Sequence, residues 1–344
     1  METGESIAVL KTDDPVAWQR YADADVPIVT QWDDGQHDGI TPGSVATSSA
    51  SMPSVVFRML QDLDVKRGSR VLEIGTGTGY NAALLAYRAG SDNIVSVDVD
   101  AAVTRSARQA LQVFGLPLEV ITADGYLGHP ERAPYDRIIA TAGVRELPFA
   151  WIDQARPGAV IVAPWGTVYG NQDAVVRLVV AADKKSASGA FTGPVEFMKL
   201  RSQRTADVEH NDYVPAEGVR SAATSSTTVT EADFLAGGKF SPAQFAVGLR
   251  VRDCLHAVSD KRDGARPVWL YSLTDRSWAV VMFVDGQSEA RVWQSGSRRL
   301  WDEVEAAYMW WEAAGRPGHE RFGLTVSAAG QRAWLDSPDV SWEV

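Results

Sequence analysis

The sequence predicts an α/β fold, a parallel sheet with helices on both faces, followed by a smaller C-terminal α+β unit. Between residues 70 and 165, short apolar runs alternate with segments rich in helix formers. Such alternation with short connections is typical of a parallel sheet. The turn from Gly75 to Gly79 separates the first apolar run from the first of these helices. A chain of 344 residues has room for two domains.

The elements of the first part follow from the length and spacing of the apolar runs. We expect strands at 70–75, 93–98, 117–122, 135–141 and 158–164, and helices at 80–89, 100–114 and 148–155. Two further strands, at 174–181 and 197–201, are expected to join the far edge of the sheet. Ahead of this part, Asp14 and Pro15 can begin a short helix, and residues 31–46 are expected to form a loop.

The second part differs in composition from the first. Residues 205–230 are rich in Ser and Thr and poor in large apolar side chains, which predicts a linker. We then expect strands at 268–272, 278–284 and 290–294, a helix from 297 to 315, and a closing hairpin of 322–326 with 333–335. Eight of the twelve Trp lie here, and they either fill a small core or form a peptide-binding groove. The predicted organisation is an N-terminal extension (1–46), a first domain (47–204), a linker (205–240) and an accessory domain (241–344).

Charge and cysteine content argue against several classes of protein. The net charge of −11 disfavours binding to nucleic acid or to an anionic membrane surface. Cys254 is the only cysteine, so no internal disulfide can form, which fits a reducing compartment. No run approaches the ~18 apolar residues of a membrane span, and the N-terminus lacks the pattern of a signal peptide. We therefore expect a cytoplasmic protein that binds neither nucleic acid nor membranes, and we expect a monomer.

Acidic residues in and after the predicted strands indicate what the glycine turn binds. Glu73 lies inside the first strand, Asp98 closes the next one nineteen residues after Gly79, and Asp124-Gly125 follows the third. An acid at this spacing can accept hydrogen bonds from a ribose diol, and glycines let a ligand approach bare backbone. The turn has neither the G-x-G-x-x-G spacing of a dinucleotide site nor the Lys of a phosphate loop. These residues predict a nucleoside site at the carboxyl ends of adjacent strands.

Longer segments over roughly residues 47–166 carry a resemblance to a known family. They are VLEIGTGTGYNAALLA (71–86), VSVDVD (95–100), ADGYLGHPERAPYDRIIATA (123–142), LPFAWIDQARPGAVIVAPWG (147–166) and Ser51-Met52-Pro53. The chain resembles the class I S-adenosylmethionine-dependent methyltransferases, and within them the protein-L-isoaspartate O-methyltransferase family. The resemblance implies a Rossmann-like methyltransferase sheet. It also implies S-adenosyl-L-methionine as cofactor, with S-adenosyl-L-homocysteine as its product.

The same resemblance implies roles for particular residues and no metal. Those expected to hold the cofactor are Glu73, Gly75, Thr76, Gly77 and Gly79 at the methionine part, Asp98 at the ribose, and Val99, Asp124 and Gly125 at the adenine. Ser51 is expected beside the transferred methyl and the acceptor carboxylate, with Met52 and Pro53 on the substrate side; the alternative for Ser51 is a plain loop or cap hydroxyl. Because a carboxylate is already ionised at neutral pH, the enzyme needs no general base.

Segments outside the first-domain motifs resemble a subgroup of these enzymes. They are FMKLRSQR (197–204), RRLWDEVEAAYMWW (298–311) and RFGLTVSAAGQRAWLD (321–336), and the subgroup belongs to actinobacterial gene clusters for lanthipeptides, lasso peptides and graspetides. This resemblance implies methyl esterification of an Asp in a modified precursor peptide, leading to aspartimide; the final product is either the aspartimide or the isoaspartate formed by its hydrolysis. The alternatives are general isoaspartyl repair, a small-molecule O-methyltransferase, and a scaffold that binds the cofactor without turnover. We expect the accessory domain to recognise the peptide, and a chain ending near residue 204 to bind cofactor without it.

Overall fold

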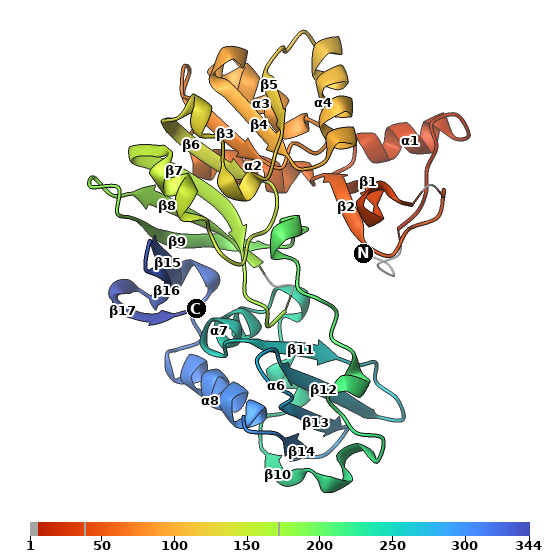
Figure 1. Cartoon of the computed structure of the whole chain (residues 1–344). Helices are drawn as coiled ribbons and strands as arrows, with labels where there is room; N and C mark the ends of the chain where they lie inside the picture. The colour runs from red at the N-terminus through yellow and green to blue at the C-terminus, as the bar shows by residue number, and fades with distance from the viewer. Residues whose placement is uncertain (1–5, 38, 171–172) are drawn as a thin grey trace.

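The computed structural model describes residues 6–37, 39–170 and 173–344, and its largest element is a ten-stranded sheet (Figure 1). The strands are β3 (Val71–Ile74), β4 (Ile94–Asp98), β5 (Glu119–Thr122), β6 (Tyr135–Ala140), β7 (Ala155–Trp165), β8 (Asp173–Val180), β9 (Ser186–Val195), β15 (Phe322–Ser327), β16 (Gly330–Leu335) and β17 (Ser337–Glu343). Their order is β17-β16-β15-β9-β8-β7-β6-β3-β4-β5. The half from β7 to β5 is parallel and the other half is antiparallel.

Helices cover both faces of the parallel half, as the sequence predicts. They are α2 (Pro53–Leu63), α3 (Tyr80–Ala89), α4 (Ala101–Val113) and α5 (Phe149–Asp153). On one face, Met59 of α2 and Leu85 of α3 pack into a buried cluster with Val71. On the other face, Trp151 of α5 packs into a second cluster with Leu72. Adjacent residues of β3 therefore point to opposite faces, each of which is buried.

The N-terminal residues form more structure than the sequence predicts. The short helix is present as α1 (Pro15–Ala22), with the Asp14 carboxylate accepting from the amide of Ala17 at 2.8 Å. The predicted loop at 31–46 is too long at both ends, because residues 31–32 belong to β1 (Ile28–Trp32) and residue 46 belongs to β2 (Ala46–Ala50). These two strands pair antiparallel. Their side chains alternate only weakly between apolar and polar, so no strand pattern could be detected there.

One strand beyond the parallel half is wrongly placed by the sequence. The strand predicted at 174–181 is present as β8, but the one predicted at 197–201 is absent from the described residues. The chain instead forms β9 at 186–195, a segment of Ser, Ala, Gly and Thr with little strand propensity. A Cβ on Gly189 would meet the carbonyl oxygen of Arg177 in β8 at 1.9 Å. The small residues of β9 therefore allow close packing between β8 and β15, and this packing, not an intrinsic preference of the residues for strands, explains why the segment is a strand.

The second sheet has five strands in the order β10-β14-β13-β12-β11. The strands are β10 (Ala223–Thr227), β11 (Cys254–Val258), β12 (Ala265–Ser272), β13 (Trp278–Val284) and β14 (Ala290–Ser295), and the helices with them are α6 (Glu231–Phe234), α7 (Pro242–Arg250) and α8 (Leu300–Ala313). The predicted α+β unit is therefore present, with two strands and two helices that were missed. β10 comes from the predicted linker and pairs with β14 along all five of its residues. A polar segment can form this strand because β10 is at the edge of the sheet, where a strand can be polar on its open face.

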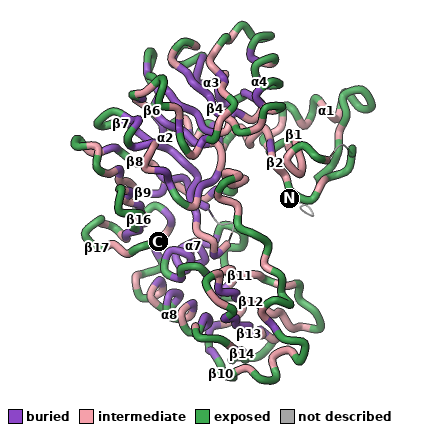
Figure 2. Tube along the Cα trace, in the orientation of Figure 1, coloured by how far each residue is buried: buried purple, intermediate pink, exposed green. Residues whose placement is uncertain are grey.

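The predicted C-terminal hairpin forms, but it does not close the second unit. β15 pairs with β9, and the hairpin with β17 thereby extends the first sheet. One buried cluster runs from Leu72 in β3 through Phe191 and Phe245 to Leu324 in β15. Figure 2 shows buried residues continuing from the first sheet into α7. The two sheets therefore share a hydrophobic core, and the chain crosses between them twice.

The Trp residues of the second part mostly fill that core. Trp278, Trp301, Trp311 and Trp334 are buried, and Trp269, Trp293, Trp310 and Trp342 are partly buried. None of these eight described side chains is exposed, which favours the core interpretation over a groove lined with Trp. Within the described ranges, no helix is both long and apolar enough to cross a membrane.

Candidate functional site

The glycine turn joins β3 to α3 at the carboxyl edge of the parallel strands. Gly75 has φ +95° and Gly77 has φ +51°, conformations that L side chains rarely adopt. A Cβ on Gly77 would also approach the carbonyl oxygen of Ser49 to 3.1 Å. The end of β2 therefore lies directly over the turn, and the two segments face each other through their backbone atoms.

Glu73 is completely buried behind this turn. Its carboxylate accepts from Asn81 Nδ2 of α3 at 2.7 Å and from the hydroxyl of Ser96 in β4. The Ser96 and Thr76 hydroxyls are 2.6 Å apart. Burial raises the pKa of Glu73 to about 7, the nearby Asp98 carboxylate adds to the rise, and the two hydrogen bonds oppose it. Glu73 thus ties the turn, the helix and the next strand together rather than lining an open surface.

Asp98 and Val99 lie at the end of the neighbouring strand. Asp98 Oδ2 accepts from the amide of Gly77 at 3.1 Å, and its Oδ1 accepts from the amide of Asp100 at 3.1 Å. Each carboxylate oxygen still has a lone pair to offer a ligand. Val99 is 45% exposed, which is unusual for an apolar residue beside a buried sheet. An acceptor and an apolar surface therefore lie next to each other at this edge.

Asp124 and Gly125 follow β5, the next strand along the edge. Asp124 Oδ1 accepts from the amide of Tyr126 at 2.9 Å, and the side chain is otherwise exposed. A Cβ on Gly125 would collide with Ile74 Cγ2 at 2.4 Å, and the Gly125 carbonyl accepts from Trp151 Nε1 at 2.9 Å. Gly125 therefore packs directly against the end of β3, at a distance that leaves no room for a side chain at this position. The predicted cofactor residues thus come together at the ends of three adjacent strands.

Ser51, Met52 and Pro53 lie between β2 and α2, where all three are partly buried. Pro53 is the first residue of α2, a position where its missing N–H costs nothing. Ser51 is two residues beyond Ser49, whose carbonyl lies over Gly77. The structure therefore brings the Ser51 segment to the glycine turn.

A charged cluster that the sequence did not predict holds the N-terminal hairpin over this edge. Arg201 Nη2 donates to Asp100 Oδ2 at 2.8 Å, and Gln31 Nε2 of β1 donates to the same oxygen at 3.0 Å. Arg201 Nε also contacts Asp34 at 2.9 Å. Burial alone would raise the pKa of Asp100, but the bonds from Arg201 and Gln31, together with those from the amides of Val103 and Ala102, outweigh it and hold the pKa at about 2. The two hydrogen bonds to Asp100 join residues 69 and 101 positions apart, which no local pattern reveals.

Comparison with known proteins identifies the family. The sequence model described as Protein-L-isoaspartate(D-aspartate) O-methyltransferase (PCMT) matches residues 17–205, more than half of the chain. The chain belongs to this family. A protein-L-isoaspartate O-methyltransferase of Xanthobacter autotrophicus is 39% identical over 166 residues, 48% of this chain and 71% of that one. One of Azorhizobium caulinodans is 44% identical over 117 residues, 34% of this chain and 53% of that one.

A solved structure bears on the part of the chain outside the family match. A protein titled protein-L-isoaspartate O-methyltransferase superposes with a TM-score of 0.51 at 22% identity, covering 93% of this chain and 89% of its own. At that identity the likeness concerns the fold alone. It confirms the α/β methyltransferase fold.

The structure fits the cofactor that family membership implies. Asp98 offers carboxylate oxygens for a ribose, Val99 offers apolar surface for a base, and the glycine turn offers bare backbone. In addition, Asn81 Oδ1 is buried without a hydrogen-bond partner in the described residues, and such atoms are rare unless something binds them. The predictions of S-adenosylmethionine as cofactor and of a carboxyl O-methyltransferase are thus confirmed. The described residues contain no group of three or more His, Cys, Asp or Glu arranged for a metal.

The C-terminal hairpin also reaches the site of this methyltransferase. Gln331 Oε1 accepts from the amide of Leu147 at 2.9 Å and from Trp165 Nε1 at 3.2 Å, and its Nε2 donates to the Arg145 carbonyl at 3.1 Å. These partners belong to the loop after β6 and to the end of β7. A residue of the last hairpin thereby fixes a loop at the carboxyl edge of the sheet.

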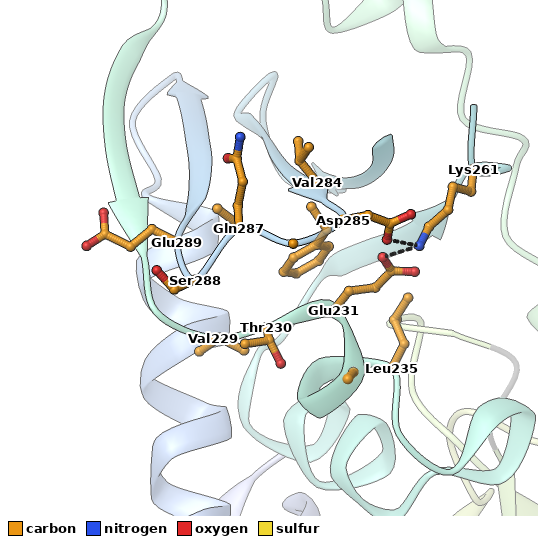
Figure 3. A pocket seen from close by; sticks show the side chains of 14 residues that line it. Val229, Thr230, Glu231, Leu235, Lys261, Val284, Asp285, Gln287, Ser288 and Glu289 are labelled. Carbon is orange, nitrogen blue, oxygen red and sulfur yellow. Dashed lines mark hydrogen bonds and ion pairs between the residues drawn. The ribbon is translucent and has the colours of Figure 1, made fainter. Parts of the chain in front are cut away.

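A pocket of about 470 Å³ lies elsewhere, in the second unit between α6 and the β13–β14 turn (Figure 3). Its floor carries Lys261 Nζ, which is 2.9 Å from Glu231 and 2.6 Å from Asp285. Because the lysine charge is already neutralised by two carboxylates, the pocket offers no free cation for an acidic ligand. It has neither the glycine turn nor the parallel strand ends that make up the candidate active site.

Proposed function

We propose that this protein transfers a methyl group to the carboxylate of isoaspartyl residues in peptides and proteins. The observation that carries the proposal is the arrangement around the glycine turn. Asp98 and Gly125 border it on one side, and the segment from Ser49 to Ser51 lies across it. This geometry brings the residues predicted to bind the nucleoside and the Ser51 segment to the same turn, and the name of the family supplies the acceptor.

Each residue of the site has a role in this proposal. Gly75, Thr76, Gly77 and Gly79 hold the methionine part of the cofactor, and the buried Glu73 supports the turn from behind. Asp98 binds the ribose hydroxyls, Val99 packs on the adenine, Asp124 and Gly125 hold the adenine edge, and Ser51, Met52 and Pro53 face the acceptor. Asp98 is the most informative of them, because both of its oxygens already contact the turn and the strand end. It can therefore couple ribose binding to the shape of the loop.

The chemistry needs alignment more than acid–base catalysis. When bound, S-adenosylmethionine supplies an electrophilic methyl group. The acceptor carboxylate is ionised at neutral pH, so the chain has to orient it and exclude water. Orientation of this kind can contribute roughly 7–11 kcal/mol to lowering a barrier. The half-buried Ser51 hydroxyl lies on the segment next to the turn, where it can donate a hydrogen bond to a carboxylate oxygen.

Replacing Asp98 with Ala tests the cofactor site. The variant should bind S-adenosylhomocysteine about 10- to 100-fold more weakly in calorimetry, because a charged hydrogen-bond acceptor is lost. Asp92→Ala is the matched control, since Asp92 is exposed and lies just before the other end of β4. Equal affinity of both variants and the wild type would contradict the proposed site.

Mass spectrometry tests the acceptor. A blocked isoaspartyl peptide should gain one methyl group in the presence of cofactor, and the same peptide with ordinary aspartate should not. If the enzyme methylates neither, isoaspartyl residues are not its substrate.

A second candidate acceptor is an aspartate in a modified ribosomal peptide, whose ester would cyclise to aspartimide. One observation favours it: the segments that resemble the peptide-cluster subgroup border the site. The 197–204 segment supplies Arg201, and the 321–336 segment supplies Gln331. A cluster-encoded precursor would then gain a methyl group and finally show a net loss of one water. Methylation of the isoaspartyl peptide alone would exclude this candidate.

A further inference from the structure

Three charged side chains gather at the carboxyl edge of the sheet, between the loop after β6 and the start of β8. Lys199 forms an ion pair with Asp173, and the two side chains are only 10% and 0% exposed. Arg145 is also partly buried and donates to the Thr167 carbonyl. We call Arg145, Asp173 and Lys199 the edge cluster.

The edge cluster lies beside the glycine turn. The Gly143 amide donates to the Met198 carbonyl at 2.8 Å, and the Gly143 carbonyl accepts from the Leu200 amide at 2.9 Å, so Lys199 runs alongside Gly143. A Cβ on Gly143 would lie 3.0 Å from Lys199 Nζ. The preceding residue, Ala142, places its nitrogen 3.5 Å from the Cβ position of Gly75. Lys199 Nζ therefore lies next to Gly143, and the residue before Gly143 contacts the glycine turn. The Lys199 ammonium is thus close to the turn.

The charge of the edge cluster favours an anionic ligand. Two cations and one carboxylate leave one positive charge, inside a chain whose net charge is −11. Glu196 also acts on Asp173 and Lys199, and it forms an ion pair with Lys239. Burying charged groups costs free energy of hydration, which offsets much of the attraction between them. An excess buried cation is therefore stabilised when an anion binds next to it.

The hydrogen bonds of the edge cluster are incomplete. Arg145 Nε is a buried donor without a partner in the described residues, and an anionic ligand can accept from it. A buried polar network that serves only stability is normally satisfied throughout. Gly143 and Gly166 flank the pair, and a Cβ on Gly166 would lie 2.1 Å from Asp173 Oδ1. Side chains are therefore kept away from the pair on two sides.

We propose that Lys199 binds the acceptor carboxylate through the oxygen that does not receive the methyl group, and that Asp173 and Arg145 position the Lys199 ammonium. The inference rests on the proposed function, because the carboxylate that Lys199 contacts is that of the isoaspartyl acceptor. As the other oxygen bonds to the methyl carbon, the carbon–sulfur bond breaks, its electron pair goes to sulfur, and the carboxylate becomes a neutral ester. The ammonium thus contacts a full charge before the reaction and a smaller one during it. Its contribution goes to binding rather than to the chemical step.

The test compares KM and kcat of full-length variants on a blocked isoaspartyl peptide whose only carboxylate is the acceptor. Lys199→Met should raise KM about 10- to 100-fold, the range for losing a hydrogen bond between charged groups, with kcat unchanged or higher. Lys199→Arg keeps the charge and should retain most of the affinity. Lys185→Met, which removes an exposed lysine just before β9 and away from the edge cluster, is the matched control and should behave as the wild type.

Two further measurements separate binding from folding. Lys199→Met leaves Asp173 buried without its cation, so the double variant Asp173→Asn/Lys199→Met removes both charges and should show the same high KM. Both variants should bind S-adenosylhomocysteine as the wild type does. A KM unchanged in the double variant, or a fall in kcat alone, would overturn the role of Lys199 while leaving the proposed function intact. A wild type that does not methylate the peptide would overturn the proposed function and this inference with it.

Discussion

Replacing Glu73 with Gln should stabilise the protein at about pH 8 and change its stability little at about pH 5. Glu73 is the completely buried carboxyl group behind the glycine turn, and its pKa is raised to about 7 mainly by burial. Above that pH the folded protein holds a negative charge away from water. Gln has nearly the same shape and never acquires this charge, so the variant avoids that cost.

The hydrogen bonds around residue 73 can be kept in the Glu73→Gln variant. The new side chain would accept from Asn81 through its carbonyl oxygen and donate through its amide to the Ser96 hydroxyl. Ser96 can then donate to the Thr76 hydroxyl, 2.6 Å away, because either hydroxyl of this pair can be the donor. A protonated Glu73 would make the same set of bonds. The variant therefore isolates the charge from the hydrogen-bond network.

The size of the effect follows from linkage. A folded-state pKa above the unfolded value means that the folded protein binds a proton more tightly, so stability falls as pH rises between the two values. For Glu73 this window runs from 4.5 to about 7, and at 1.36 kcal/mol per pH unit it corresponds to about 3 kcal/mol. Below the window the two proteins should be alike, and above it the variant should be more stable by about that amount.

Urea unfolding followed by tryptophan fluorescence measures this difference at the two pH values. Glu289→Gln, at an exposed position in the second unit, is the control for the substitution itself. The reasoning would be refuted if Glu73→Gln shifted the free energy of unfolding equally at both pH values, or if it destabilised the protein more at the higher pH.

Three further predictions concern single side chains. Arg201→Ala should release the β1–β2 hairpin, lowering the protection of its amides against hydrogen exchange by roughly 1.5–3 kcal/mol; unchanged protection would show that the charged contacts do not hold it. Gln331→Ala should lower kcat/KM for the peptide and leave the Kd of S-adenosylhomocysteine unchanged, because it frees the loop at Leu147 and not the glycine turn. Cys254 is buried with a pKa raised to about 12, so iodoacetamide should label it only after unfolding; rapid labelling of the native protein would contradict its burial.

The parallel half of the fold was predictable because its signals are local. The helix expected at 80–89 is α3, and each expected strand from 70 to 164 overlaps an observed one. The candidate cofactor residues follow from the same pattern. Asp98 and Asp124 come at the ends of strands, and the ends of neighbouring parallel strands meet at one edge. The sequence alone therefore predicted that these residues lie close together, without any knowledge of side-chain contacts.

The rest depended on contacts between distant parts of the chain. β9 has small residues and no apolar alternation, so only its neighbours β8 and β15 define it as a strand. Arg201, Lys199 and Gln331 border the site through partners far away in sequence, and nothing in their immediate surroundings marks them. The only indication was that the segments 197–204 and 321–336 resemble a subgroup of the family. That resemblance identified the segments but not their contacts.

A chain ending near residue 204 should fail to fold stably, in contrast to what the sequence predicts. Removing β15 exposes β9 along the five residues that pair with it, and an open edge rich in backbone donors and acceptors promotes aggregation. The truncation also removes Phe245 and Phe322 from the cluster that contains Phe191 of β9, and each lost aromatic side chain costs about 3–5 kcal/mol. Size-exclusion chromatography and calorimetry with S-adenosylhomocysteine would check this. A monomeric truncated chain that binds the product normally would show that the first sheet is independent of the second part. Until then, single substitutions such as Gln331→Ala test the role of the C-terminal part more cleanly, because they keep the shared core intact.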